Sequence, residues 1–363
     1  MSRRKNDKYY AILMAGGVGS RFWPSSKASN PKQFIDILGV GESLFQITFK
    51  RLSRLIPSEN ILVLTNRKYV DKIKNQVPEI KDEQIVPEPE MRNTAPSILL
   101  GALKIRKMNP EGRIVVAPCD HWIQQEDEFL DVLETAFESL ENQDRLLTLG
   151  VQPDSPNTGY GYIEFDKADK GEIKKVKKFT EKPDLATAEA FLEAGNYVWN
   201  AGIFIWSADF IVRNFRKHLP GMYAIFEEGL DNLNTEREND FLKENYAKSD
   251  NISIDYGIME KARDVYVIPV SFSWNDLGTW TSVQKELSKD ENGNTLINTR
   301  LEADNATNNI ISTFNGKIVA LKGLSDFIIV EDENVLMIVP KSEEQEIKKL
   351  REEVMKKYGN DLG

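Results

Sequence analysis

The chain has 363 residues, a formal net charge of −10 at pH 7 and a single cysteine. This length is enough for one large domain with a small one or for two medium domains, and one cysteine excludes an internal disulfide framework. The acidic balance argues against binding of nucleic acid through a basic face, and no apolar run approaches the ~20 residues of a membrane span. The N-terminal residues lack the apolar core of a signal peptide, so we expect a cytoplasmic protein that binds neither nucleic acid nor membrane.

Over the first 150 residues, short apolar runs alternate with amphipathic segments. The runs predict a strand that begins at Ala11 and further strands at 61–64, 85–86, 114–116 and 146–149. The segments between them predict helices at 43–56, 69–77, 98–107 and 129–140. This alternation is typical of an α/β fold with a doubly wound, mostly parallel sheet, on which ligands bind beyond the carboxyl ends of the strands.

The second half of the chain is organised differently. Mixed strands and helices with aromatic and glycine-containing segments indicate an inserted substrate-binding half at about 151–287. A polar linker leads into short apolar runs broken by Asn, Gly and Asp, which predict a small all-β appendage over 295–340 and then a helix over 342–358. We therefore expect a catalytic domain over residues 1–290 and a small C-terminal β domain with a terminal helix over 291–363.

The first strand ends at Ala15 and runs into the glycine-rich turn Gly16-Gly17-Val18-Gly19, which is followed by Arg21 and later by Lys32. A strand, a glycine turn and a cation can wrap backbone N–H groups around phosphate. The turn lacks the Gly-Lys-Ser/Thr of a P-loop, and it has Phe22 where a dinucleotide fold needs a small residue. Two separate cations suit a polyphosphate, whereas the alternative is a glycine-rich turn with solvated Arg and Lys.

The pattern G-G-x-G-x-R-F, with Pro31-Lys32-Gln33 after it, resembles the signature of the sugar-nucleotidyltransferases, the nucleotide-sugar pyrophosphorylases. Phe22-Trp23-Pro24 is similar to the mannose-1-phosphate guanylyltransferase branch, and the resemblance runs in order from about residue 10 to 340. It implies a Rossmann-like nucleotidyltransferase fold with a β-helix-like appendage. It also implies Mg²⁺-dependent transfer of GMP from GTP to mannose 1-phosphate, giving GDP-mannose and pyrophosphate, with nucleotide contacts at Ala15, Gly16, Gly17 and Gly19.

Two aspartates are candidate metal ligands. With only two histidines in the chain, metal chemistry should use carboxylates, and Mg²⁺ takes few of them beside phosphate oxygens and water. Asp120 follows a predicted strand, and Asp276 lies in Trp274-Asn275-Asp276-Leu277-Gly278. Taken alone, the first could be a helix cap and the second a turn former. The resemblance places the metal-binding aspartates of the family in these two motifs.

The stretch Glu88-Pro89-Glu90-Met91-Arg92-Asn93-Thr94-Ala95-Pro96 matches the E-P-x-x-R-N-T-A-P motif typical of guanylyltransferases. Guanine presents N–H donors beside an O6 acceptor; Glu88 only accepts hydrogen bonds, and Asn93 both accepts and donates. We expect nucleotide contacts at Glu88, Asn93, Thr94 and Pro96. A capped helix start with solvated Arg92 would account for residues 93–96 without any ligand, although the two roles are compatible.

Three further stretches resemble the sugar-phosphate site of the family. Glu181 and Lys182 would pair a hydroxyl acceptor with a phosphate-binding cation, against the alternative of a surface ion pair. Gly161 would let the backbone approach a sugar ring closely, and Asn200 would bond vicinal hydroxyls; a β-bulge and a buried turn residue are the alternatives. The segment 253–261, Ser-Ile-Asp-Tyr-Gly-Ile-Met-Glu-Lys, also matches the family, but we assign it no chemistry.

The leading hypothesis gives each group a role. Arg21 and Lys32 hold the triphosphate, Asp120 and Asp276 hold Mg²⁺, and Lys182 orients the incoming sugar phosphate. One alternative is a related nucleotidyltransferase for another sugar 1-phosphate, such as glucose 1-phosphate, and another is a non-catalytic regulatory subunit that binds GDP-mannose. The appendage could form the contact of a homodimer or cover the catalytic domain.

Overall fold

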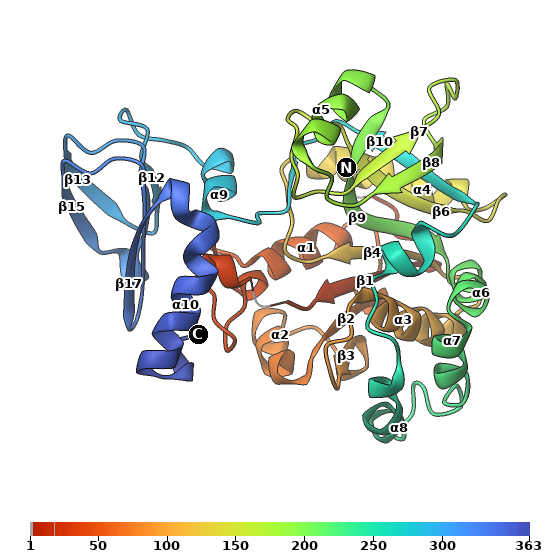
Figure 1. The fold of residues 1–363 in the computed structure, drawn as a ribbon. Coiled ribbons are helices and arrows are strands. Elements are labelled where there is room, and N and C mark those ends of the chain that lie inside the picture. Colours follow the sequence, from red (N-terminus) through yellow and green to blue (C-terminus); the bar gives the residue numbers. More distant parts are fainter. Residues whose placement is uncertain (1–2, 18) are drawn as a thin grey trace. The chain divides into compact units, whose positions relative to one another are not determined.

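The computed structural model describes residues 3–17 and 19–363, so Val18 in the glycine-rich turn lies outside the described residues. The chain forms two compact units (Figure 1). Unit 1 comprises Met1–Gly16, Phe49–Pro118 and Ile123–Trp274. Unit 2 comprises Gly17–Thr48, Cys119–Trp122 and Asn275–Gly363.

Unit 1 is built on a nine-stranded sheet in the order β3-β2-β1-β4-β9-β6-β10-β8-β7. Strands β3, β2, β1 and β4 run parallel to one another, and β6 runs parallel to β10, whereas β9 runs antiparallel between β4 and β6. The predicted doubly wound α/β fold is confirmed. The strands are β1 (Tyr9–Ala15), β2 (Ile61–Asn66), β3 (Ile85–Glu88), β4 (Arg113–Pro118), β6 (Leu146–Val151), β7 (Tyr162–Phe165), β8 (Lys174–Thr180), β9 (Tyr197–Ser207) and β10 (Val265–Val270).

Both faces of this sheet are buried, which explains why β1 reads as a continuous apolar run. Tyr10 and Ile12 point to one face, where they share an apolar core with α3, α6 and α7, the group of helices seen together in Figure 1. Tyr9 points to the opposite face and stacks on Phe137 of α4 with ring centroids 4.2 Å apart. The helices of this unit and of the junction at residue 48 are α1 (Leu44–Ser53), α2 (Val70–Gln76), α3 (Thr94–Met108), α4 (Glu126–Ser139), α5 (Leu185–Ala194), α6 (Ala208–His218), α7 (Pro220–Glu227) and α8 (Glu238–Asn245).

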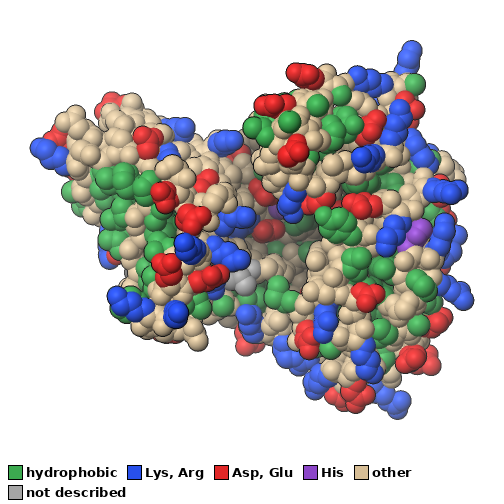
Figure 2. Space-filling model, in the orientation of Figure 1, with side chains coloured by type: hydrophobic (Ala, Val, Ile, Leu, Met, Phe, Trp, Pro, Cys, Tyr) green, Lys and Arg blue, Asp and Glu red, His purple; other side chains and the backbone are tan. Residues whose placement is uncertain are grey.

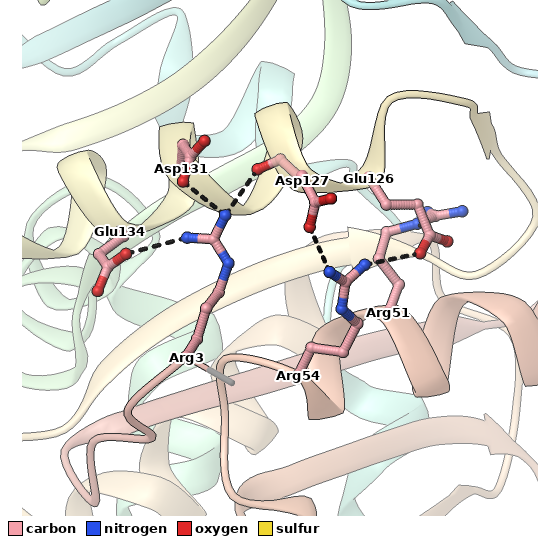
Figure 3. A network of polar contacts seen from close by, with 7 residues as sticks. All are labelled: Arg3, Arg51, Arg54, Glu126, Asp127, Asp131 and Glu134. Carbon is pink, nitrogen blue, oxygen red and sulfur yellow. Dashed lines mark hydrogen bonds and ion pairs between the residues drawn. The ribbon is translucent and has the colours of Figure 1, made fainter. Parts of the chain in front are cut away.

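Helix α4 begins with three acidic residues, and arginines from two other segments bind its exposed side (Figure 3). Arg51, only 2% exposed, donates from Nε to Glu126 Oε1 at 3.0 Å, and Arg54 pairs with Glu126 and Asp127. Arg3 binds Asp131 and Glu134 one and two turns further along. The network ties α4 to the end of α1 and to the N-terminal segment, and it contains none of the predicted site residues.

Unit 2 contains the predicted all-β appendage, which coils as a β-helix. Strands β12 (Thr295–Ile297), β14 (Ile310–Ser312) and β16 (Phe327–Asp332) pair in parallel, as do β13 (Arg300–Asp304) and β15 (Ile318–Lys322), while β17 (Val335–Pro340) closes the first sheet antiparallel to β16. Buried Asn309 donates to Asn294 Oδ1 at 3.0 Å and accepts from Phe327 N at 2.9 Å. The asparagines between the apolar runs thus link successive coils.

The helices of unit 2 are α9 (Trp280–Glu286) and α10 (Ile347–Tyr358); α10 begins later than the predicted helix because Lys341–Glu346 form a 3₁₀ turn. Two short strands, β5 (Trp122–Ile123) and β11 (Trp274–Asn275), lie where the chain passes between units. No described helix is long and apolar enough to cross a membrane. Hydrophobic side chains gather on the surface of the C-terminal β-segments in Figure 2. The exposed large apolar residues of β15 and β17 are Ile318, Leu336 and Ile338.

The residues after the glycine-rich turn belong to unit 2. Phe22 and Trp23 are buried in its apolar core, and the Phe22 ring packs edge-on against Trp280 of α9 at 5.2 Å. Trp23 also donates from Nε1 to the carbonyl of Leu362 at 2.7 Å. Segments 17–48 and 119–122 therefore group with the C-terminal residues, and the expected division at residues 290 and 291 stays a prediction.

Candidate functional site

The glycine-rich turn needs its glycines for two reasons. Gly17 and Gly19 have φ of 86° and 67°, a region that side chains with a Cβ rarely occupy. A Cβ on Gly19 would lie 2.6 Å from Cβ of Lys32, so the glycine permits the close approach of these two segments. Arg21 follows on the exposed side, and no ion pair joins it to a described residue. Its guanidinium is thus available for an anionic ligand.

Lys32 is the buried cation of unit 2, with 3% of its surface exposed. Its Nζ donates to Asp120 Oδ2 at 2.9 Å, to the Asp276 carbonyl at 2.7 Å and to the Leu277 carbonyl at 3.0 Å. An ammonium has three donors, so all of them are engaged. One lysine therefore brings the two predicted metal-binding segments together, and direct contact between Lys32 and a phosphate would require it to exchange one of these partners.

The two aspartates differ in their surroundings. Burial raises the pKa of Asp120, but the neighbouring Lys32 ammonium and His121 outweigh it, and the net pKa lies below the ordinary value. Asp276 accepts at Oδ1 from the Gly278 N–H at 3.0 Å, which orders the turn. Two carboxylates suit Mg²⁺ as oxygen ligands, because this ion needs few protein ligands. No group of three acidic, histidine or cysteine side chains that could hold a metal occurs in residues 3–17 and 19–363.

In unit 1, the guanylyltransferase-like motif spans the end of β3 and the start of α3. Asn93 is the N-cap of α3: its side chain accepts from Thr94 N at 3.1 Å, and its φ of 64° and ψ of −163° are nearly exclusive to glycine. Thr94 accepts at Oγ1 from Ile254 N at 2.9 Å, and Pro96 is buried in the first turn. The predicted helix cap is confirmed, while nucleotide contacts of these residues stay a prediction.

Glu88 ends β3 and is anchored at one oxygen. Its Oε1 accepts hydrogen bonds from the hydroxyls of Ser97 and Tyr246, which lie 3.2 Å from each other. Burial raises the pKa of Glu88, and these two hydrogen bonds act in the opposite direction; the net pKa is above the ordinary value. Oε2 receives no hydrogen bond from the part of the chain that the structure describes.

The predicted sugar residues of unit 1 lie together. Lys182 Nζ is 2.9 Å from Glu181 Oε1, and this hydrogen bond raises the pKa of the lysine. A Cβ on Gly161 would lie 2.4 Å from Glu181 Oε2 and 3.6 Å from Cβ of Asn200, so a larger residue here would displace the Glu181 carboxylate. Asn200 accepts at Oδ1 from Gly202 N at 3.1 Å and donates from Nδ2 to Asp255 Oδ1 at 2.8 Å.

Asp255 is a member of this cluster that the sequence did not identify. It lies at the start of the π-helix Asp255–Met259, an element that occurs often at functional sites. Burial raises its pKa, the Asn200 hydrogen bond lowers it, and the nearby Glu181 raises it further. The match of segment 253–261 to the family was the signal, but residue types alone do not reveal a buried carboxylate beside Asn200.

Backbone strain marks three of the motifs. Among the described residues other than glycine, positive φ occurs at Asn93, whose angles are given above, at five other Asn and Asp residues, which tolerate it, and at Lys182 and Leu277, both with φ of 46°. Such conformations cost free energy and persist mainly where function requires them. Lys182 is next to the predicted sugar acceptor Glu181, and Leu277 follows the predicted metal ligand Asp276.

The predicted site residues are divided between the units. Unit 2 holds the predicted phosphate and metal set, which comprises Gly17, Gly19, Arg21, Lys32, Asp120 and Asp276. Unit 1 holds the base and sugar sets: Ala15, Gly16, Glu88, Asn93, Thr94, Pro96, Gly161, Glu181, Lys182 and Asn200. Ala15 is fully buried at the end of β1, where its carbonyl accepts from Thr65 Oγ1 at 3.1 Å.

Comparison with known proteins gives a consistent result. The nucleotidyl transferase family matches residues 10–293, and the mannose-phosphate isomerase/GMP-like β-helix domain matches residues 303–354. The chain is 34% identical over 361 residues to mannose-1-phosphate guanylyltransferase 2 of Escherichia coli O157:H7, covering 94% of this chain and 72% of that protein. It is 34% identical over 354 residues to mannose-1-phosphate guanylyltransferase of Salmonella montevideo, covering 94% and 73%.

A solved structure agrees with these matches. The crystal structure of a Thermus thermophilus protein named mannose-1-phosphate geranyltransferase superposes with a TM-score of 0.86 and 30% identity, covering 96% of this chain and 99% of that one. The fold, the β-helix domain and the sequence thus point in one direction. The chain belongs to the mannose-1-phosphate guanylyltransferases of the nucleotidyl transferase family and is a nucleotidyltransferase that acts on a sugar 1-phosphate.

Proposed function

We propose that the protein transfers GMP from GTP to α-D-mannose 1-phosphate and releases pyrophosphate. The sugar-phosphate oxygen attacks the α-phosphate in line, and no covalent enzyme intermediate forms. This nucleophile is already an anion, so the site needs no general base. Catalysis then rests on positioning and on stabilising the charge that moves towards the pyrophosphate.

The observation that carries the proposal is the contact of one buried ammonium, Lys32, with the segments of both Asp120 and Asp276. These two carboxylates would hold Mg²⁺, which neutralises charge on the phosphates when bound. Exposed Arg21, at the end of a turn with two positive-φ glycines, would bind phosphate oxygens through its planar fork of donors. Lys32 would thus act mainly by positioning the two aspartates, whereas the sequence predicts that it holds the triphosphate together with Arg21.

The base and sugar sets support the choice of substrates. Glu88 Oε2 is an acceptor for the N–H groups of guanine, and exposed Asn93 supplies both a donor and an acceptor. Glu181, together with Asp255, would accept hydrogen bonds from sugar hydroxyls, and Lys182 would bind the incoming phosphate. Each group is held by contacts within its own unit, consistent with a preformed site.

The test is direct detection of the product. Purified protein is incubated with GTP, mannose 1-phosphate and Mg²⁺, and GDP-mannose and pyrophosphate are measured together, with an arm containing EDTA. We expect equal amounts of both products and none with EDTA. A protein that binds GDP-mannose and forms neither product would instead be the regulatory subunit. A cytoplasmic location and a homodimer remain part of this proposal, and the latter is tested by sedimentation at micromolar protein.

A further inference from the structure

The segment that follows α8, residues 246–255, is tied to the base motif at three points. The Tyr246 hydroxyl donates to Glu88 Oε1, the Ile252 carbonyl accepts from Ala95 N at 3.1 Å, and Ile254 N donates to Thr94 Oγ1 at 2.9 Å. The partners are about 160 residues apart in sequence and all belong to unit 1. The proposed function gives this segment no role until Asp255.

The Tyr246 hydroxyl is itself held rigidly. The side chain is fully buried, and its ring packs edge-on against Phe226 with centroids 5.9 Å apart. Burial and the neighbouring Glu88 raise the pKa of Tyr246 far above its ordinary value, so the phenol is a neutral donor. Tyr246 and Ser97 both donate to one oxygen of Glu88, which fixes the carboxylate plane and leaves the other oxygen for a ligand.

We propose that Tyr246 is a positioning residue for recognition of the nucleotide base. By holding Oε1 of Glu88, it aims Oε2 at the N1–H and N2–H groups of guanine, while residues 252–254 fix the first turn of α3 that carries Thr94. The inference rests on the proposed function, because it takes guanine as the base and Glu88 as its acceptor. Tyr246 would not contact the nucleotide itself, but it would set the preference for guanine through Glu88.

A second consequence concerns pH. Burial raises the pKa of Glu88, and the hydrogen bonds from Ser97 and Tyr246 lower it. Two other groups shift the pKa values of Glu88 and Tyr246. The Ser97 hydroxyl lowers both, and the Arg92 guanidinium lowers that of Tyr246. Loss of the Tyr246 hydroxyl therefore raises the pKa of Glu88. The carboxylate would then be protonated, and lost as an acceptor for guanine, at a higher pH.

The experiment compares Tyr246→Phe with Tyr223→Phe in the full chain. Tyr223 is another tyrosine of unit 1 (6% exposed), and no hydrogen bond of its hydroxyl to a described residue is seen, so Tyr223→Phe removes a hydroxyl of the same chemistry without touching Glu88. Steady-state kinetics are measured with GTP and with ITP, which lacks the N2 amino group. For Tyr246→Phe we expect a KM for GTP raised about tenfold, from loss of a hydrogen bond to a charged group. We also expect a smaller GTP-to-ITP preference, an acid limb of kcat/KM at higher pH, and a KM for mannose 1-phosphate within twofold of the wild type.

Two results would overturn the proposed role of Tyr246. Tyr246→Phe kinetics equal to those of Tyr223→Phe, with the same pH profile and the same nucleotide preference, would overturn the inference. A parallel rise of both substrate KM values would also overturn it, since that is the signature of a general structural defect. If Tyr246→Phe does not fold, Ser97→Ala removes the other donor to the same oxygen and is held to the same criteria. Failure of the proposed function is distinct: wild-type protein would then not use GTP.

Discussion

Lys32 Nζ donates a 2.9 Å hydrogen bond to Asp120 Oδ2, which places a buried cation directly against one of the two carboxylates proposed to hold Mg²⁺. The same nitrogen also binds the carbonyls of Asp276 and Leu277. The glycine at position 19 makes this possible, because any larger residue would collide with Lys32. The two segments proposed to bind the metal are thus held together by contacts within unit 2.

Replacing the two phosphate-loop cations should have different effects. Lys32→Met leaves Asp120 and two carbonyls without their donor, so we expect a loss of about 3 kcal/mol in the free energy of unfolding and no activity. Arg21→Met removes an exposed side chain, so stability should change by less than about 0.5 kcal/mol while the KM for GTP rises about tenfold. Urea unfolding and kinetics measure both. Equal destabilisation by the two variants would refute the distinction.

Asp276→Asn should abolish most activity without unfolding the protein. Asparagine can still accept from Gly278 N, and the carbonyl bonded to Lys32 is unchanged, so the turn is preserved. The lost negative charge weakens metal binding, and we expect turnover to fall about a hundredfold or more. The measurement is a Mg²⁺ titration of turnover alongside thermal unfolding. Turnover comparable to wild type at saturating Mg²⁺ would remove Asp276 from the metal site.

Asp255→Asn should stabilise the protein while weakening sugar-phosphate binding. Burial raises the pKa of Asp255 in the folded protein above its ordinary value of 3.8. In the unfolded chain we expect Asp255 to have that ordinary value. Between the unfolded and folded pKa values the folded state binds more protons, so wild-type stability falls as pH rises through this window and then stays lower. Asparagine cannot ionise, and the gain of the variant over wild type should therefore grow from pH 4 upwards and level off. Urea unfolding of both proteins from pH 4 to pH 8 measures it; a pH-independent difference would count against a buried, ionised Asp255.

The two arginines that bind Glu126 offer a matched test of stability (Figure 3). Arg51 is buried, contacts Glu126 and lies 5.8 Å from the Phe129 ring centroid, whereas Arg54 is exposed. Arg51→Met should lower the free energy of unfolding by about 3 kcal/mol, and Arg54→Met by less than about 1 kcal/mol. Chemical denaturation compares them. Similar losses would show that the burial of Arg51 does not determine its contribution.

Most of the fold could be predicted from the sequence because its signals are local. The apolar runs at 61–64 and 146–149 gave strands, and Asn93 with Pro96 gave the start of α3. What the sequence did not show is the grouping of segments 17–48 with the β-helix, which depends on non-local packing of Phe22 and Trp23. Residue periodicity carries no information about such partners.

For the candidate site too, the sequence predicts individual residues but not the contacts between them. Residue types and the family motifs led to Arg21, Asp120 and Asp276, whose chemistry is evident from their side chains. The sequence could not reveal that all three donors of Lys32 are engaged, or that Tyr246 and Asp255 support Glu88 and Asn200. These relations join residues 55 to 245 positions apart and follow only from the folded chain.

The central claim is most directly tested by pyrophosphate release over a matrix of substrates. GTP, ATP, dTTP and UTP are each paired with mannose 1-phosphate and with glucose 1-phosphate, in Mg²⁺ and in EDTA. We expect release with GTP and mannose 1-phosphate in Mg²⁺, and with no other combination at a comparable rate. Preferential release with glucose 1-phosphate, or with a nucleotide other than GTP, would contradict the assignment of substrates and leave only the family and the fold.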